Sequence, residues 1–128
     1  MSAPPAPDPP REIRTPPPRF RGGPGEIAPV FAALGDETRL RLVTRLSAEG
    51  PLSIARLTAG GGITRQAVTK HLQVLAQAGI ARSQTLGRER IWTLEPEPLL
   101  TARQCLDDVS AQWDQALSRL RALVEESI

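Results

Sequence analysis

One stretch of this chain, Ile63–Arg82, constrains the fold more than any other, because it contains the start, both faces and the end of a single helix. Thr64 stands where an N-cap is needed, since its hydroxyl can accept a hydrogen bond from a free amide of the first turn. Gly79 stands where a left-handed C-terminal cap is needed. Residues spaced by four and three positions form an apolar stripe between these caps: Val68, Leu72 and Leu75. The stretch therefore predicts one amphipathic helix of about four turns.

The opposite face of this helix carries polar side chains that can bind a nucleic acid. They are Thr64, Arg65, Gln66, Thr69, Lys70 and Gln73. Arg, Lys, Gln and Thr side chains can hydrogen-bond base edges or phosphate oxygens, and no carboxylate on this face would repel a phosphate backbone. An ordinary solvated helix surface has a similar composition, so the neighbouring segments must decide between the two interpretations.

The segments on either side of the helix favour duplex DNA as its ligand. Upstream, Ser53 can cap a short helix carrying Ile54 and Leu57, and a glycine-rich turn at residues 60–62 follows, which predicts a helix-turn-helix unit. Downstream, β-type residues flank a turn at Gly87, which predicts a hairpin. These residues are Ile80 and Ser83 before the turn, and Ile91, Trp92 and Leu94 after it.

Arg88 and Arg90 lie at or beside the tip of the predicted hairpin. A two-stranded wing laid along a duplex would bring them to phosphates or to the minor groove. The alternative is that they only keep a hairpin edge soluble. The charge distribution favours DNA, since residues 36–90 contain nine basic and four acidic residues, whereas residues 91–128 contain three basic and seven acidic ones.

Two further helices are expected before this unit. The first spans Glu26–Leu34 with Pro29 in its first turn, and the second follows the cap Asp36 and ends at Gly50. The residues of the second helix that we expect to face inward are Leu40, Leu42, Val43 and Leu46.

Thr38 and Arg39 lie in the first turn of that second helix. Free amides and the positive end of the helix dipole could meet a phosphate of the DNA backbone there. The other interpretation is that Asp36 and Thr38 merely cap the helix, and both interpretations can hold together.

A long helix is expected after Pro96 and Pro98, over about residues 97–126. Two sets of residues recur every seven positions: Leu99, Leu106, Trp113 and Leu120, and in between Ala102, Val109, Ala116 and Leu123. This pattern indicates a packing seam over about four heptads. We expect the seam to form a homodimer interface through Leu99, Leu106, Val109, Trp113, Leu120 and Leu123. The alternative is a core helix within one chain.

Residues 1–25 contain nine of the thirteen prolines and no apolar periodicity, so we expect a disordered tail before one folded domain at residues 26–128. Its arginines, which are Arg11, Arg14, Arg19 and Arg21, either touch flanking DNA or stay solvated. We find neither a signal peptide nor an apolar stretch that could span a bilayer, and therefore expect a cytoplasmic protein with no membrane partner.

Taken in order, these motifs resemble the ArsR-type family of small winged helix-turn-helix repressors. The resemblance rests on FAALGDETRLRLVTRL, TRQAVTKHLQVLAQAGIARS and GRERIWTLEP, and it covers about residues 26–128. It implies a mainly α fold with a small β-hairpin wing and a long C-terminal dimerisation helix. It also implies a transcriptional regulator that binds an inverted-repeat operator as a homodimer. Gly61 departs from the family, which usually has an apolar residue in that turn.

The resemblance raises metal sensing, but the chain has few ligands for a metal. Cys105 is its one cysteine and His71 its one histidine, whereas thiolate or imidazole sites need two or more such ligands. We therefore expect no metal and no cofactor. His71 should pack or contact a phosphate, and Cys105 should be a small core residue instead of a redox switch. The sequence does not decide whether a small-molecule effector binds.

An enzyme is not expected, because a chain with a single imidazole cannot assemble a Ser-His-Asp or Cys-His set without using the DNA-binding face. The competing hypothesis is a winged-helix module that binds protein and whose basic face is only solvated. Duplex binding should weaken steeply as salt rises, whereas a protein interface should not.

Overall fold

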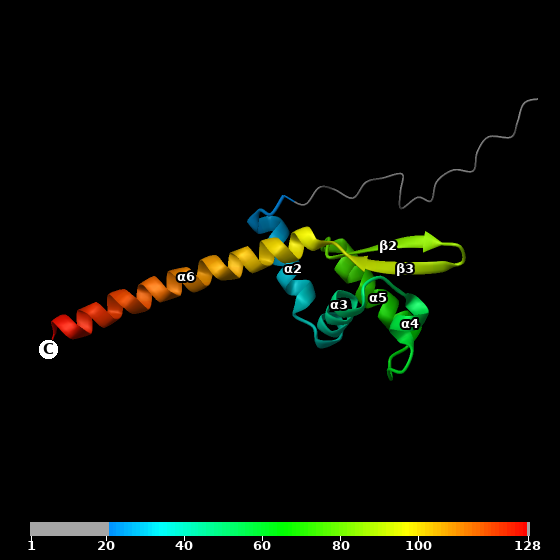
Figure 1. Ribbon diagram of the computed structural model, residues 1–128, viewed down its shortest axis with the longest axis horizontal. Coiled ribbons are helices and arrows are strands. Elements are labelled where there is room, and N and C mark those ends of the chain that lie inside the picture. Colours follow the sequence, from blue (N-terminus) through cyan, green and yellow to red (C-terminus); the bar gives the residue numbers. More distant parts are fainter. Residues whose placement is uncertain (1–20, 128) are drawn as a thin grey trace, which may run out of the picture.

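The computed structural model describes residues 21–127, so most of the tail expected at residues 1–25 lies outside the described part. In chain order, the elements are α2 (Pro24–Leu34), α3 (Glu37–Glu49), β1 (Leu52–Ser53), α4 (Ile54–Thr58), α5 (Arg65–Gln77), β2 (Ala81–Leu86), β3 (Glu89–Leu94) and α6 (Pro96–Glu126). Figure 1 shows a body of short helices with a two-stranded ribbon at one end and the long α6 projecting from the other. The expected mainly α fold with a small wing is confirmed.

The two helices that precede the helix-turn-helix unit differ from expectation in two details. α2 begins at Pro24, two residues early, because a proline at the first helical position needs no amide partner; Pro29 therefore lies inside the helix, beyond its first turn. In α3, the inward face is Leu42, Val43 and Leu46, whereas Leu40 is 50% exposed. The prediction for Leu40 was wrong because this residue lies about 200° around the helix from Leu42.

Side-chain and glycine caps set the limits of α4 and α5 as predicted. The Ser53 hydroxyl accepts the amide of Arg56 at 3.2 Å, and the Thr64 hydroxyl accepts that of Ala67 at 3.1 Å. Gly79 is left-handed, with φ +82°, and follows the end of α5. Its amide donates to Ala76 O, and the next amide donates to Leu75 O, which is the Schellman pattern.

The wing belongs to a three-stranded antiparallel sheet with the order β1-β3-β2. The hairpin β2–β3 confirms the prediction, whereas the third strand, β1, is additional. β1 pairs Leu52 with Trp92 and Ser53 with Ile91. Two residues are too few to show an alternating pattern, so this strand could be recognised only from its partner.

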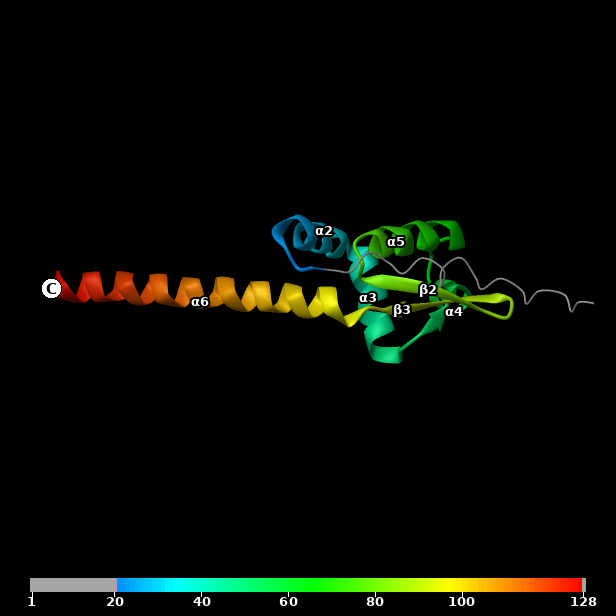
Figure 2. The ribbon, with the colours of Figure 1, turned by 90° about the horizontal axis from the view of Figure 1, so that it is seen from above.

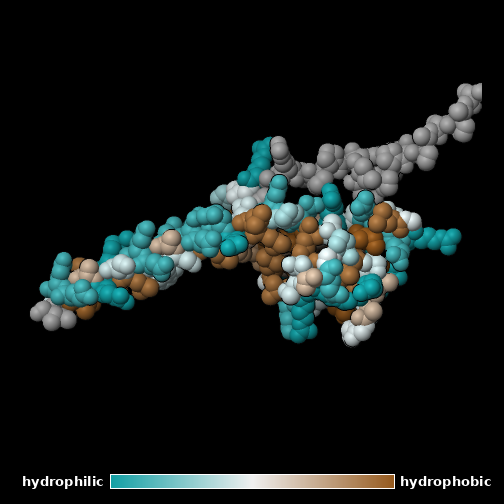
Figure 3. Space-filling view, in the orientation of Figure 1, coloured by the Kyte–Doolittle hydropathy of each residue, from teal (hydrophilic) through white to brown (hydrophobic). Residues whose placement is uncertain are grey.

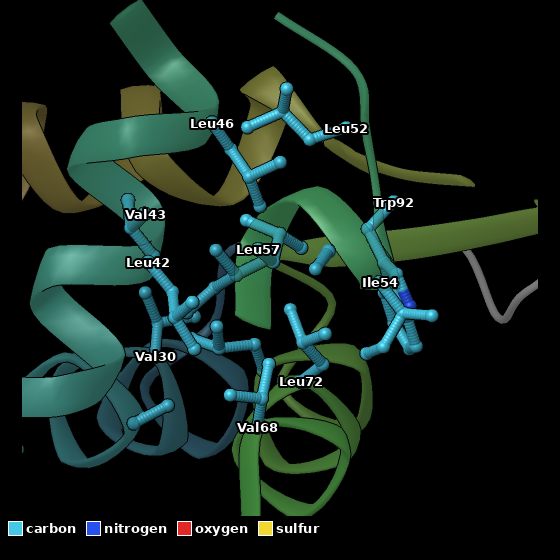
Figure 4. Packing of buried hydrophobic residues seen from close by; sticks show 14 of the residues in the cluster. Val30, Leu42, Val43, Leu46, Leu52, Ile54, Leu57, Val68, Leu72 and Trp92 are labelled. Atoms are coloured by element: carbon cyan, nitrogen blue, oxygen red, sulfur yellow. The ribbon is translucent and has the colours of Figure 1, made fainter. Parts of the chain in front are cut away.

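One hydrophobic core holds these elements together. Figure 4 shows side chains from the helices of the body and from β1 and β3 converging on it. Val68, Leu72 and Leu75 of α5 are completely buried there, as the apolar stripe predicted. Burial of each such side chain contributes about 1.5–3 kcal/mol, so the core fixes which face of α5 remains outside.

The helix α6 leaves this body after its first turns. Ala102 is 5% exposed and Leu99 packs against the core, whereas Leu106, only four residues beyond Ala102, is 56% exposed. Figure 3 shows brown, hydrophobic side chains along the projecting part of the helix. The exposed large apolar residues beyond Ala102 are Leu106, Val109, Trp113, Leu117, Leu120, Leu123 and Val124.

Candidate nucleic-acid interface

The polar face of α5 lies on the surface. Arg65, Gln66, Lys70 and Gln73 are exposed, and Thr69 is half-buried. The Thr69 hydroxyl donates to Arg65 O at 2.8 Å, and the Thr64 hydroxyl is the N-cap acceptor, so both retain lone pairs for other donors. Arg65 and Gln66 occupy the first turn of the helix, where side chains can reach beyond the body of the protein.

The wing presents its arginines at a tight turn. Leu86 pairs with Glu89, which leaves Gly87 and Arg88 as the two-residue loop, and Gly87 has φ +63°. A positive φ at this position is typical of the turns that close two-residue hairpins. Arg88 is exposed in the loop, and Arg90 is exposed on β3 opposite Thr85.

The recognition helix and the wing point the same way. Figure 2 shows the first turn of α5 and the tip of the β2–β3 hairpin at the end of the molecule opposite the C-terminus of α6. The Arg65 and Gln66 turn and the Arg88 loop can therefore face one extended ligand together. An anionic duplex suits two basic elements held side by side in this way.

Thr38 and Arg39 occupy different surroundings. Both are half-buried at the start of α3. The Arg39 guanidinium points toward α2, where Nε donates to Ala33 O at 2.7 Å and Nη2 donates to Ala32 O at 3.5 Å. Its Nη1 lies 3.4 Å from Nδ1 of His71 on α5. The expected phosphate contact would have to compete with these bonds.

Asp36 and His71 complete this cluster. The Asp36 carboxylate accepts the Arg39 amide at 3.0 Å and lies 3.8 Å from His71 Nδ1. The hydrogen bond from the Arg39 amide lowers the pKa of Asp36, opposed by partial desolvation and assisted by the charge of Arg39. Asp36 therefore caps α3, as one of the two sequence-based interpretations proposed.

No group of three or more His, Cys, Asp or Glu residues suited to a metal ion occurs within residues 21–127. Cys105 is a free, half-buried thiol on α6. Within the same residues, no helix is both long and apolar enough to cross a membrane.

A groove of about 400 Å³ lies where the end of α3, the end of β3 and the start of α6 meet. Its lining is mostly apolar and includes Leu46, Leu94, Leu99 and Leu100.

Comparisons with known proteins agree with this arrangement. A family model described as a helix-turn-helix domain matches residues 34–84. An HTH-type transcriptional regulator of Mycobacterium tuberculosis is 36% identical over 95 residues, which cover 74% of this chain and 85% of that protein. The chain belongs to the ArsR-type family of winged helix-turn-helix transcriptional regulators. It is therefore a DNA-binding regulator of transcription.

Two solved structures show how far the likeness to this family extends. An ArsR-like transcriptional regulator from a Rhodococcus species has a TM-score of 0.67 at 33% identity, covering 77% of this chain and 92% of that one. An antimony-specific transcriptional repressor has a TM-score of 0.53 at 31% identity, covering 74% of this chain and 91% of that one. The family resemblance inferred from the motifs is thus confirmed.

The sequence did not reveal the contact between Arg39 and His71. These residues are 32 positions apart, and neither periodicity nor capping patterns relate positions at that separation. The one available signal was that His71 borders the apolar stripe of α5, which placed it near the core but named no partner.

Proposed function

We propose that this ArsR-type regulator binds an inverted-repeat operator as a homodimer, represses transcription from it, and does so without a metal cofactor. The observation that carries the proposal is the shared orientation of the α5 first turn and the wing, with Arg65, Gln66 and Arg88 exposed. In helix-turn-helix proteins, residues at the start of the recognition helix enter the major groove and contact base edges.

We assign base contacts to Arg65 and Gln66, with guanine and adenine as their default partners. Lys70 lies more than one turn further along α5, so we assign it, with Arg88 and Arg90 on the wing, to the phosphate backbone. Thr64, Thr69 and Gln73 border the same face and would support these contacts, and Thr38 remains a candidate backbone contact at the start of α3.

The exposed row on α6 supports the homodimer. Leu106, Val109, Trp113, Leu120 and Leu123 are all at least 43% exposed in the single chain. A contiguous apolar surface of this kind marks an interaction site. Because the row keeps the seven-residue spacing of a helical seam, a second copy of the same helix is the partner that fits it. A two-fold dimer would then place two α5 helices about one turn of DNA apart.

The proposal is tested by selection from random duplexes with the purified full chain, followed by affinity measurements from low to high salt. We expect enrichment of one inverted repeat and a steep loss of affinity with salt. If nothing is enriched and a bound protein partner shows little salt dependence, the protein-interaction alternative would replace operator binding.

A further inference from the structure

Arg39 joins three helices of the body. Its guanidinium bonds Ala33 O and Ala32 O at the C-terminal end of α2, and its Nη1 meets His71 on α5. Its own amide is bonded to Asp36, which fixes the start of α3. The last carbonyls of a helix lack partners within the helix and attract cations, so Arg39 stabilises the end of α2 while it reaches α5.

The chemistry of the contact defines what His71 must offer. An arginine side chain has only donors, so a hydrogen bond here requires the Nδ1 atom of His71 to accept. The ring lies at the edge of the core, since its side chain is 25% exposed.

The contact between Arg39 and His71 constrains the orientation of α5 in a way that its buried apolar stripe does not. Val68, Leu72 and Leu75 hold the helix by apolar burial, which depends little on direction. A hydrogen bond depends on angle and distance, and it therefore resists rotation and sliding of the helix. His71 lies six positions after Arg65, or about 9 Å along the axis, so a small rotation at His71 moves the base-contacting turn.

We propose that Arg39 is a positioning residue that acts through His71 to set the orientation of the recognition helix, in place of the phosphate contact expected from the sequence. This proposal rests on the operator binding proposed above. A positioning role and a phosphate contact for Arg39 predict different binding measurements. A phosphate contact contributes to every duplex and to the salt dependence, whereas a positioning residue contributes to the preferred operator alone.

The first experiment measures affinity for the operator and for an unrelated duplex at several salt concentrations. The variant is Arg39→Lys, which keeps the charge but cannot serve both Ala33 O and His71. We expect about tenfold weaker operator binding, with the unrelated duplex and the salt slope unchanged. Arg41→Lys is the matched control, because Arg41 lies on the same helix, is exposed and pairs only with Glu37 among the described residues. It should behave as the unaltered protein.

A second pair of variants tests the role of His71 without disturbing α2. His71→Asn retains an acceptor near the position of Nδ1, whereas His71→Phe removes it. We expect the asparagine variant to keep operator affinity within about threefold and the phenylalanine variant to lose about tenfold, with both folded by circular dichroism. Arg39→Lys should add little to His71→Phe, because both remove the same contact.

Three results would overturn the proposal. The first is equal affinity of the Asn and Phe variants, and the second is full additivity of the Arg39 and His71 substitutions. The third concerns Arg39→Gln, which removes the charge that Arg39→Lys keeps: an equal loss of affinity on both duplexes with a smaller salt slope. If the unaltered protein prefers no duplex, operator binding itself has failed. That result is distinct, because it appears before any variant is compared.

Discussion

Single side chains at helix starts cap the helix and also determine where the neighbouring side chains lie. Asp36 and Thr64 each accept the amide three residues later, at 3.0 and 3.1 Å, and so define where α3 and α5 begin. A cap of this type contributes about 1 kcal/mol. Because the cap at Thr64 fixes the first turn of α5, it also fixes where Arg65 and Gln66 leave the body.

The lowered pKa of Asp36 predicts a dependence of stability on pH. Its carboxylate is favoured in the folded state, so its contribution to the free energy of unfolding is complete above the unfolded pKa and is lost as pH falls through the folded one. Asp36→Asn keeps a cap without a titrating group. We expect the stability advantage of the unaltered protein over this variant to shrink as the pH falls from about 5 to about 2 in urea titrations. A difference that stays constant over this range would contradict the assignment.

The proposed base and backbone contacts predict different losses. Arg65→Ala or Gln66→Ala should cost about 1–3 kcal/mol on the preferred operator and relax the preference at one base position per half-site. Lys70→Ala, Arg88→Ala and Arg90→Ala should weaken all sequences nearly equally and lower the salt slope by about one unit per lost contact. A matrix of variants against sequences at two salt concentrations measures both. The assignment of roles is wrong if the wing variants change base preference and Arg65→Ala does not.

Among the helices, α6 differs because most of its apolar surface is not buried within the single chain. Its first turns pack against α2, and Ala102 is buried, but the seam continues for about three more heptads with exposed large apolar side chains. Leu99 packs against the chain's own core, so the two alternatives from the sequence apply to different parts of one helix. We assign the later part to a second subunit.

Charges placed in that later part should prevent association. We expect Leu106→Glu with Leu120→Glu to give a monomer with greatly reduced operator affinity, because two glutamates cannot be desolvated in the seam and one half-site binds weakly. Sedimentation equilibrium gives the mass. Gln115→Glu with Ser118→Glu is the control, since both positions are exposed and lie outside the seam. A Leu106, Leu120 double variant that still sediments as a dimer would rule out this interface.

The whole molecule combines a basic middle and an acidic end. The basic part holds α5 and the wing at one end, and α6 carries the acidic residues to the other. This separation suits a chain that meets DNA at one end and another subunit at the other. Its relatives include a repressor named as specific for antimony, yet this chain contains one cysteine and one histidine, on α6 and α5 respectively.

Because the chain has only one cysteine and one histidine, we predict that zinc, cadmium and arsenite leave operator affinity unchanged. An effector shifts binding only if it has different affinities for two states of the protein, and a single thiol or imidazole is too few donors for a selective site. Affinity measured with and without each metal, in a buffer free of chelators, provides the check. A loss of about tenfold or more would reveal donors that the described residues do not show.

Features that depend on neighbouring positions could be predicted from the sequence. The caps at Ser53, Thr64 and Gly79 and the hairpin turn at Gly87 join residues at most five apart, and successive residues of the buried stripe of α5 are three or four apart. Backbone hydrogen bonds and helical periodicity act over that range, so the pattern and the structure agree there.

Features that join distant parts of the chain could not be predicted from the sequence, because they depend on packing. β1 exists because Leu52 meets Trp92, and Arg39 reaches His71 across 32 residues. The candidate site divides in the same way. The exposed face of α5 follows from its periodicity, whereas the direction of the Arg39 side chain depends on the carbonyls that α2 brings beside it. Packing selects among contacts that local preferences leave equal, because it buries whole faces at once.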